Sequence, residues 1–161
     1  STGNIPVSLA PTDLNVLLSQ VCGEYQQRLE KQVLEPVLSL CEPGAAAMAD
    51  GRLLWRVLDN LMSNICKYAM PGTRVYLTTE REGDTARMVV RNISRYPLNI
   101  SADELTERFV RGDSSRSTEG SGLGLSIATS LMSLQGGGFR LTIDGDLFKV
   151  TLTLPAAGAE E

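Results

Sequence analysis

The sequence predicts an α+β fold: a two-layer α/β sandwich in which a mixed, mostly antiparallel sheet packs on three helices. Three segments carry apolar residues at helical spacing, and several shorter segments have the composition of strands. Two turn signals, Glu82-Gly83-Asp84 and Asp144-Gly145-Asp146, each join two of these strands. Because the hairpins are separate from the helices in sequence, one helical layer on one face of the sheet is the most economical packing.

The first part of the chain is predicted to combine one long helix with short strands. Pro11-Thr12-Asp13 marks the start of the helix, with Thr12 as its N-cap, and leucines follow at helical spacing. Pro36 favours an edge position or a bulge for the strand that contains it. We therefore expect a short strand at 5–9, a helix at 12–32, and strands at 33–41 and 45–49.

The rest of the chain is predicted to contain two helices, two hairpins and a loop. One helix ends before Pro71-Gly72, and Gly136-Gly137-Gly138 ends the other. The loop before the last helix is polar and rich in glycine. In chain order we expect a helix at 51–68, strands at 73–81 and 85–93, a short helix at 101–109, a loop at 110–122, a helix at 123–135, and strands at 138–144 and 147–154.

Length and composition indicate one globular domain and exclude several classes of chemistry. The 161 residues are 42% hydrophobic and 21% charged, which is ordinary for a single domain; we place it at 5–155, with flexible ends at 1–4 and 156–161. A net charge of -4 argues against nucleic acid or an anionic membrane as a partner. The chain contains no histidine, so Ser-His-Asp triads and histidine metal sites are excluded, and three widely spaced cysteines suggest neither disulfides nor zinc.

The helix at 51–68 carries polar residues beside its core face. Asn60, Asn64, Lys67 and Tyr68 are spaced i, i+4, i+7 and i+8, which lines them along one edge of the helix. An amide oxygen can ligate Mg²⁺, a lysine can contact phosphate, and an aromatic ring can pack on a flat base. The alternative is that all four are ordinary residues at the boundary between core and solvent.

A glycine-rich segment, Gly120-Ser121-Gly122-Leu123-Gly124-Leu125, leads into the last helix. Glycines let backbone N–H groups approach an anion closely, and a helix N-terminus adds partial positive charge. The loop before it contains Arg111 and Arg116 among small polar residues, which suits a lid over phosphates. The segment is not a P-loop, because no Gly-Lys-Ser/Thr follows. A purely structural helix start after a solvated loop is the alternative.

The two motifs together resemble those of a known family. LDNLMSNICKYA (58–69) closely resembles the asparagine box of sensor histidine kinases. ERFVRGDSSRSTEGSGLGLSIA (107–128) is similar to their phenylalanine box, ATP lid and second glycine box in unbroken order, and FKVTLTLP (148–155) is similar to their ending. The resemblance extends from about residue 5 to 155. It implies the Bergerat fold, which gyrase, the Hsp90 chaperone and MutL share, and ATP with Mg²⁺ as the ligand.

The resemblance implies roles for individual residues. Asn64 matches the Mg²⁺ ligand, Asn60 its neighbour, Lys67 the phosphate-contacting lysine and Tyr68 the residue beside adenine. The ATP-hydrolysing relatives have glutamate in place of Asn60, and an amide does not accept a proton usefully, so transfer is favoured over hydrolysis. The resemblance assigns the lid anchor and further nucleotide contacts to Phe109, Arg111, Arg116, Gly120, Gly122, Leu123 and Gly124.

The sequence departs from the family at the first glycine box, Asp-x-Gly-x-Gly, which is expected after the strand at 85–93. Asn92 stands in place of the aspartate, and both glycines are missing from 91–98. The aspartate accepts a hydrogen bond from the adenine amino group. An asparagine also accepts one, but charge-assisted hydrogen bonds are roughly twice as strong. We therefore expect ATP to bind here with weakened affinity.

The absence of histidine also bears on partners, because a kinase of this type phosphorylates a histidine on a dimerisation domain. We expect that domain, and through it a response regulator, to be the partners of a cytoplasmic, monomeric fragment of a kinase anchored in the bacterial plasma membrane. The main alternative is a non-catalytic nucleotide-sensing or partner-docking module on the same fold. A serine kinase that acts on an anti-sigma-factor antagonist is a third reading, which the lid sequence fits less well.

Overall fold

The computed structural model describes residues 5–96 and 121–158, so the predicted helix at 101–109 and nearly all of the predicted loop at 110–122 lie outside the described residues. Side chains in the last helix are described from Leu125 onward. The elements in chain order are β1 (Ala10–Asp13), α1 (Leu14–Glu24), α2 (Gln26–Lys31), β2 (Glu35–Ser39), β3 (Ala46–Ala49), α3 (Gly51–Tyr68), β4 (Arg74–Glu82), β5 (Thr85–Ile93), α5 (Ser121–Leu134), β6 (Gly138–Asp144) and β7 (Leu147–Pro155).

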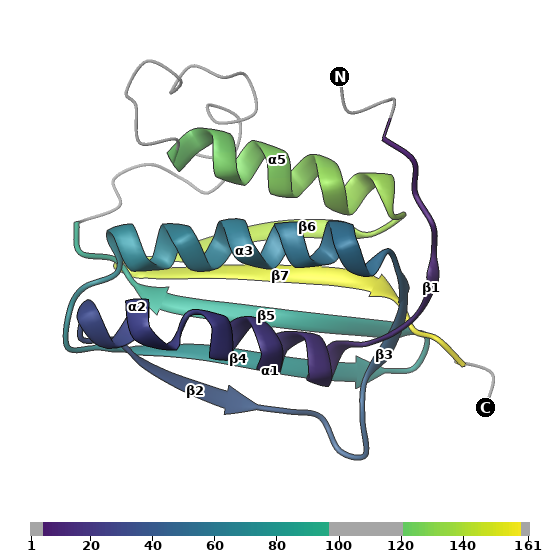
Figure 1. The fold of residues 1–161 in the computed structure, drawn as a ribbon, viewed down its shortest axis with the longest axis horizontal. Helices are drawn as coiled ribbons and strands as arrows, with labels where there is room; N and C mark the ends of the chain where they lie inside the picture. The colour runs from purple at the N-terminus through teal and green to yellow at the C-terminus, as the bar shows by residue number, and fades with distance from the viewer. Residues whose placement is uncertain (1–4, 97–120, 159–161) are drawn as a thin grey trace.

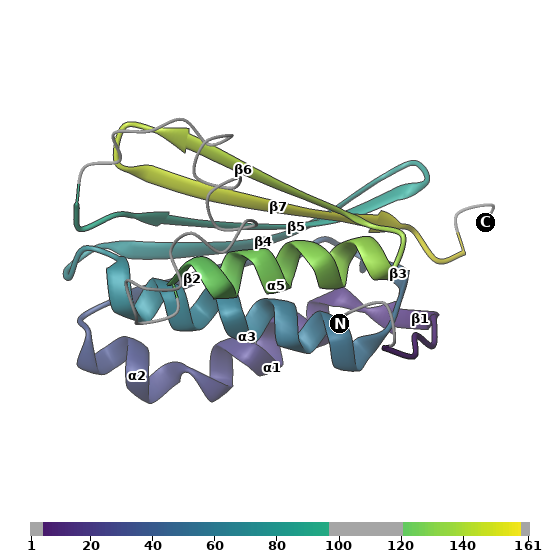
Figure 2. The same ribbon diagram turned by 90° about the horizontal axis from the view of Figure 1, so that it is seen from above.

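The elements form two layers. Five strands make one sheet in the order β2-β4-β5-β7-β6, with β2 parallel to β4 and the other neighbours antiparallel. The helices α1, α3 and α5 lie side by side on one face of this sheet (Figure 1), and the view from above shows that the other face carries no helix within the described residues (Figure 2). The predicted two-layer sandwich with a mixed, mostly antiparallel sheet is confirmed.

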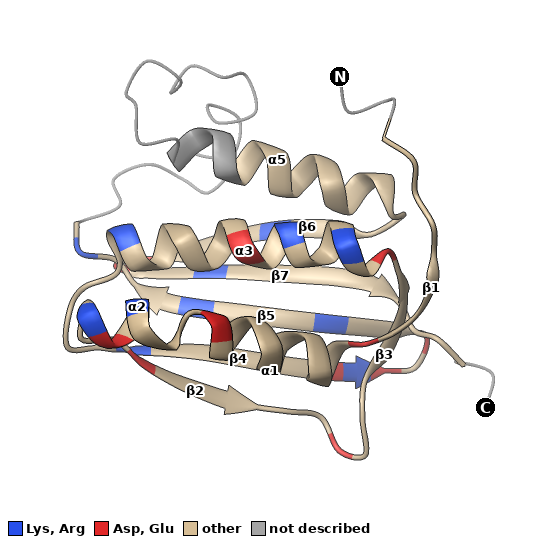
Figure 3. Ribbon diagram, viewed as in Figure 1, with Lys and Arg blue, Asp and Glu red and all other residues tan. Residues whose placement is uncertain are grey.

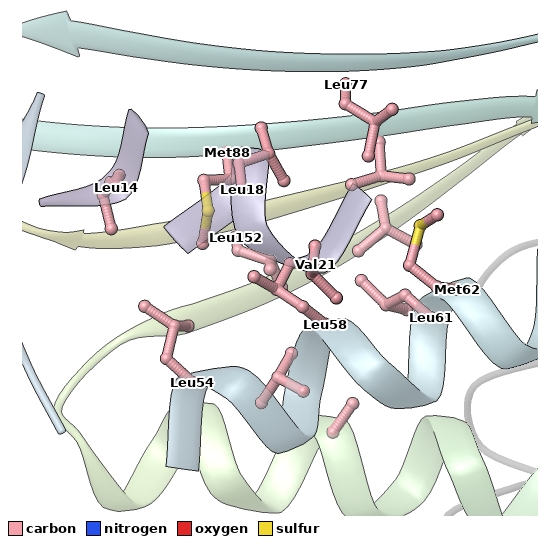
Figure 4. Packing of buried hydrophobic residues seen from close by; sticks show 14 of the residues in the cluster. Leu14, Leu18, Val21, Leu54, Leu58, Leu61, Met62, Leu77, Met88 and Leu152 are labelled. Carbon is pink, nitrogen blue, oxygen red and sulfur yellow. The ribbon is translucent and has the colours of Figure 1, made fainter. Parts of the chain in front are cut away.

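The core lies between the sheet and the helices. Strand residues that alternate along β4, β5 and β7, such as Leu77, Met88 and Leu152, point toward the helices (Figure 4) and are fully buried. Leu58 and Met62 meet them from α3, the central helix. Each buried leucine or methionine side chain stabilises the fold by roughly 1.5–3 kcal/mol relative to an exposed one, so this single core fixes the helices relative to the strands.

The predicted first strand is wrong in position. Residues 5–9 form no strand, and β1 lies at Ala10–Asp13, where it pairs with the short strand β3 in a separate two-stranded sheet. The apolar residues at 5–9 suggested a strand, yet two of them, Ile5 and Val7, pack against the core without a strand partner. Pairing with β3 decides the strand position, and local apolar content does not reveal that partner.

The predicted start and length of the first helix are also wrong. Its N-cap is Asp13, whose carboxylate accepts a hydrogen bond from Val16 N, whereas the Thr12 hydroxyl donates to backbone oxygens of β1 and β3. The helix breaks at Tyr25, which has φ -97° and ψ 4°, into α1 and α2. The Tyr25 hydroxyl donates to Asp59 Oδ1 over 2.6 Å, so a contact with α3 accompanies the break.

Most other elements lie where the sequence predicts them. The bounds of α3, β5 and β6 match the prediction, and those of β2, β3, β4, α5 and β7 differ from it by at most two residues at each end. The chain is ordered slightly past the predicted domain end at 155, because the amide groups of Ala156 and Ala157 bind Asp84 O and Ala46 O. None of the helices in the described residues has the length and apolar character needed to cross a membrane.

Gly137 connects α5 to β6, and its lack of a side chain is required by close packing. A Cβ at Gly137 would lie 2.5 Å from the carbonyl oxygen of Thr153 and 2.8 Å from Cδ2 of Leu154. We therefore expect Gly137→Ala to lower the free energy of unfolding by about 2 kcal/mol, since the backbone must shift to relieve the overlap. Urea denaturation at neutral pH measures this difference.

Gly23 provides the matched control for that substitution. It lies in α1, and a Cβ there would have no neighbour within 4 Å. We expect Gly23→Ala to raise the free energy of unfolding by about 0.5–1 kcal/mol, because alanine favours the helix. Equal effects of the two substitutions would contradict the packing account of Gly137.

Candidate nucleotide site

The candidate site begins on the edge of α3. Asp50 caps the helix, and the leucines of its core face are buried against the sheet. Asn60, Asn64 and Tyr68 are half-buried beside that face, and Lys67 is exposed. Within the described residues, neither asparagine side chain has a hydrogen-bond partner. The edge position that the spacing predicted is therefore observed, and two amide groups there are available to a ligand.

The end of β5 is joined directly to the C-terminal end of α3. Met70 N donates to Ile93 O over 2.8 Å, and Arg95 N donates to Tyr68 O over 2.8 Å. These two hydrogen bonds form a clamp between α3 and β5: they hold the C-terminal end of the helix against the C-terminal end of the strand. They bring Asn92, which is 24 residues from Tyr68 in sequence, to the same end of the molecule as the α3 asparagines.

Asn92 is the most distinctive polar residue at this end. It alternates with Ala86, Met88 and Val90, which are buried, so it points to the helix-covered face of the sheet. The residue is only 5% exposed, yet its carboxamide has no hydrogen-bond partner in the described part of the chain. The carboxamide is not fully enclosed, since the described side-chain atoms that are buried without a partner are Nε of Arg91 and Nε of Arg95. It is therefore accessible to a ligand, which it can meet with an acceptor oxygen and a donor nitrogen.

The glycine segment reaches the same end of the fold. Gly122, Leu123 and Gly124 fall in the first turn of α5, which lies beside α3 and runs in the opposite direction (Figure 1). The N-terminus of α5 and the C-terminus of α3 are therefore neighbours, and a helix N-terminus favours an anion. The other predicted contacts, Phe109, Arg111, Arg116 and Gly120, lie outside the described residues.

The site offers amide oxygens and few charged groups for a metal. Among the described residues there is no group of three or more histidine, cysteine, aspartate or glutamate side chains that could hold a metal ion. Mg²⁺ does not need such a group, because it retains several waters and takes one or two protein oxygens together with substrate phosphates. The asparagine edge of α3 fits that mode of binding.

One residue near the site was not predicted. Arg95 follows β5, its backbone N–H binds Tyr68 O, and its Nε is buried without a hydrogen-bond partner in the described residues. A buried guanidinium nitrogen without a partner costs roughly 1–3 kcal/mol or more. No sequence signal indicated this residue, since Arg95 stands in the segment that departs from the family motif.

Comparison with known proteins gives a consistent result. Residues 49–158 match the family model described as "Histidine kinase-, DNA gyrase B-, and HSP90-like ATPase". The chain is 32% identical over 145 residues to the probable sensor protein PcoS of Escherichia coli, covering 87% of this chain and 31% of PcoS. It is 35% identical over 154 residues to the sensor histidine kinase HprS of Escherichia coli strain K12, covering 92% and 32%. The chain thus spans about a third of the length of these relatives.

Solved structures show the same fold. The catalytic domain of the histidine kinase ThkA superposes with a TM-score of 0.80 at 21% identity, covering 92% of this chain and 95% of that one. Full-length ShkA in complex with AMPPNP superposes with a TM-score of 0.77 at 28% identity, covering 95% of this chain and 32% of that one. The described elements are therefore those of histidine kinase catalytic domains.

Proposed function

Because the chain belongs to the family of histidine kinase-, DNA gyrase B- and HSP90-like ATPases, we propose that it binds ATP with Mg²⁺ and transfers the γ-phosphoryl group to a histidine of a separate dimerisation domain. The observation that carries this proposal is the Asn92 carboxamide, which lacks a partner in the described residues and lies at the same end as the asparagine edge of α3. The full-length relatives are sensor proteins by name, so the activity of the whole protein is part of the proposal.

In this proposal, Asn64 and Lys67 hold the phosphate end of the nucleotide. The amide oxygen of Asn64 ligates Mg²⁺, which neutralises charge on the phosphates, and Lys67 contacts phosphate as a point charge. Gly122, Leu123 and Gly124 supply the N-terminal turn of α5 to the same phosphates. The lid residues Phe109, Arg111, Arg116 and Gly120 remain predictions from the sequence.

The base end of the nucleotide lies between Tyr68 and Asn92. The Tyr68 ring flanks adenine, and the Asn92 carbonyl oxygen accepts a hydrogen bond from the adenine amino group. Both residues are fixed by the clamp between α3 and β5, which supports a preformed base pocket. No second protein group competes for the Asn92 amide within the described residues.

Asn60 favours transfer over hydrolysis. A carboxylate at this position would activate water, whereas the asparagine amide does not accept a proton usefully at neutral pH. The protein then mainly positions the acceptor and the phosphates and offsets charge in the transition state. The nucleophile is a histidine nitrogen, which forms a bond to the γ-phosphorus as ADP leaves. The chain as given contains no histidine, so another segment must supply it.

The partners follow from this chemistry and from the names of the relatives. We propose that the chain is the cytoplasmic catalytic part of a sensor kinase, that it acts as a monomeric unit on the dimerisation domain, and that a response regulator receives the phosphoryl group afterwards. A second candidate, a non-catalytic nucleotide-sensing or docking module, is favoured by the missing glycines in 91–98.

Two measurements test the proposal. Calorimetric titration of the chain with ATP, with and without Mg²⁺, is expected to give Mg²⁺-dependent binding. Autophosphorylation of the parent protein with labelled ATP is expected to give a phosphohistidine. Binding without transfer, in a folded parent that retains its acceptor histidine, would favour the sensing or docking module.

The Asn92 assignment makes a specific prediction. We expect Asn92→Asp to bind ATP about tenfold more tightly, because a carboxylate accepts a charge-assisted hydrogen bond from the adenine amino group. We expect Asn92→Leu, which has similar volume and no acceptor, to bind at least about tenfold more weakly. Calorimetry with ATP and with GTP checks both, and an equal response of the two nucleotides would contradict a contact with the adenine amino group.

A further inference from the structure

The face of the sheet opposite the helices carries a shallow hollow of about 480 Å³, formed by β4, β5, β6 and β7. Four cationic side chains, four threonines, one valine and one glutamate line it. The basic residues of these strands lie behind the helical layer in the view of Figure 3. The hollow is therefore separated by the sheet from the candidate nucleotide site, since Asn92 points to the other face.

One of the four cations is already neutralised within the chain. Arg87 binds Glu80 Oε1 over 3.1 Å and Glu82 Oε1 over 2.6 Å. Further along the same face of β5, Arg91 lies opposite Tyr76 and not opposite a carboxylate. Its guanidinium lies 5.0 Å from the Tyr76 ring centroid. Of the two arginines on this face of β5, Arg87 is thus paired with carboxylates and Arg91 is not.

The remaining three cations are grouped across neighbouring strands. Arg91 pairs directly with Lys149 in the ladder between β5 and β7, and Arg140 of β6 is a diagonal neighbour of Lys149. Like charges directly opposite each other destabilise a sheet. In the described part of the chain, Arg140 and Lys149 form no ion pair, and Arg91 Nε is buried without a hydrogen-bond partner. This charge is concentrated on a chain whose net charge is -4.

We propose that this basic hollow, defined by Arg91, Arg140 and Lys149, binds a short acidic segment of a partner polypeptide. Carboxylates would relieve the repulsion between Arg91 and Lys149. The same face already uses this pairing, because Arg87 is held by two glutamates. An extended segment presents alternate side chains to one side, so acidic residues at alternate positions match a flat sheet face.

A peptide fits the hollow better than a nucleic acid does. A nucleic-acid backbone carries regularly spaced phosphates and needs a run of cations along it. Within the described lining only three cations lack a carboxylate partner, and Glu80 of β4, which also lines the hollow, would repel further phosphates. The threonines beside the cations, Thr142 and Thr151, offer hydroxyl groups to peptide N–H and C=O groups.

The test is fluorescence anisotropy of a labelled peptide with glutamate at alternate positions, titrated with the whole chain at low salt. The same peptide with glutamine in place of glutamate serves as the ligand control. We expect saturable binding of the glutamate peptide, weakened by added salt because the contacts are ionic and partly exposed. The double variant Arg91→Gln/Lys149→Gln is expected to bind at least about tenfold more weakly.

Lys31→Gln/Arg56→Gln is the matched protein control. It changes the net charge equally and alters exposed residues of α2 and α3, away from the sheet. It is expected to bind the peptide as the wild type does, and both variants are expected to bind ATP normally. Thermal melting verifies folding, and Lys149→Gln is expected to melt no lower than the wild type.

The proposal is overturned by any of three results: no saturable peptide binding, an equal loss of binding in both double variants, or tighter binding of single-stranded DNA than of the peptide. None of these results depends on nucleotide binding, so they leave the proposed kinase function separately testable.

Discussion

Asn64→Ala is expected to abolish the dependence of ATP binding on Mg²⁺ and to lower phosphotransfer by the parent protein at least about 100-fold. A magnesium ion held by few protein oxygens loses much of its affinity with any one of them, and positioning and charge neutralisation are nearly all that a phosphotransfer enzyme supplies. Asn64 is half-buried on the edge of α3, where an alanine is well tolerated by a helix. The loss should therefore be functional and not structural.

Calorimetry with ATP at several Mg²⁺ concentrations measures the first effect, and labelled-ATP transfer measures the second. Ser63→Ala is the matched control: Ser63 is half-buried on α3 and immediately precedes Asn64, which places the two side chains about 100° apart around the helix axis. It is expected to change neither quantity by more than about twofold. If Asn64→Ala retained Mg²⁺-dependent binding, Asn64 would not be the metal ligand, and Asn60 on the same edge would be the next candidate.

The sheet and the central helix could be predicted because their signals are local. Gly83 and Gly145 adopt φ values of 60° and 62° in the two hairpin turns, which is the conformation that the sequence signals required. Once each turn is placed, alternation fixes which side chains of β4 to β7 enter the core. The helix α3 begins after a capping aspartate and ends close to a proline, so local residues indicate both of its ends.

The first strand could not be placed because its position depends on a distant partner. β1 pairs with β3, a strand of mostly alanine with little β propensity, so neither strand is specified by its own residues. The helix break at Tyr25 also involves a distant residue, since a hydrogen bond to Asp59 on another helix accompanies it. Long-range contacts of this kind override the local pattern that predicted one helix over 12–32.

The candidate site was predictable only in part for a similar reason. The spacing of Asn60, Asn64 and Tyr68 places them on one helix edge, and the structure has them there. The sequence does not reveal that Asn92 is 5% exposed without a partner in the described residues, because burial depends on the clamp between α3 and β5. Likewise, the two positive charges of Arg91 and Lys149 face each other only because of the register between β5 and β7.

Asp50→Ala is expected to lower the free energy of unfolding by about 3 kcal/mol, the largest stability change among the substitutions considered. The carboxylate is 3% exposed and accepts hydrogen bonds from the backbone N–H groups of Ser8, Arg52 and Leu53. Loss of the helix cap, which includes the hydrogen bonds from Arg52 and Leu53, costs about 1 kcal/mol, and loss of the acceptor for the part-buried Ser8 N–H adds roughly 1–3 kcal/mol. Asp13→Ala, which removes only the exposed cap of α1, should cost about 1 kcal/mol.

The pH dependence of stability separates the contribution of the negative charge of Asp50 from that of its hydrogen-bond acceptor. Burial acts to raise the pKa of the Asp50 carboxyl, but hydrogen bonds from Ser8, Leu53 and Arg52 and the Arg52 guanidinium outweigh it, so the pKa is lowered. A lowered folded-state pKa gives stability that is fully present above the unfolded pKa of about 3.9 and is lost as the pH falls through the folded value. Asp50→Asn keeps an acceptor but lacks this charge. Its deficit against the wild type should therefore be constant from neutral pH down to about pH 5 and shrink below about pH 4, as urea denaturation at a series of pH values measures. A deficit that stayed constant into the acid range would mean that the Asp50 carboxylate stabilises the fold no better than a neutral amide.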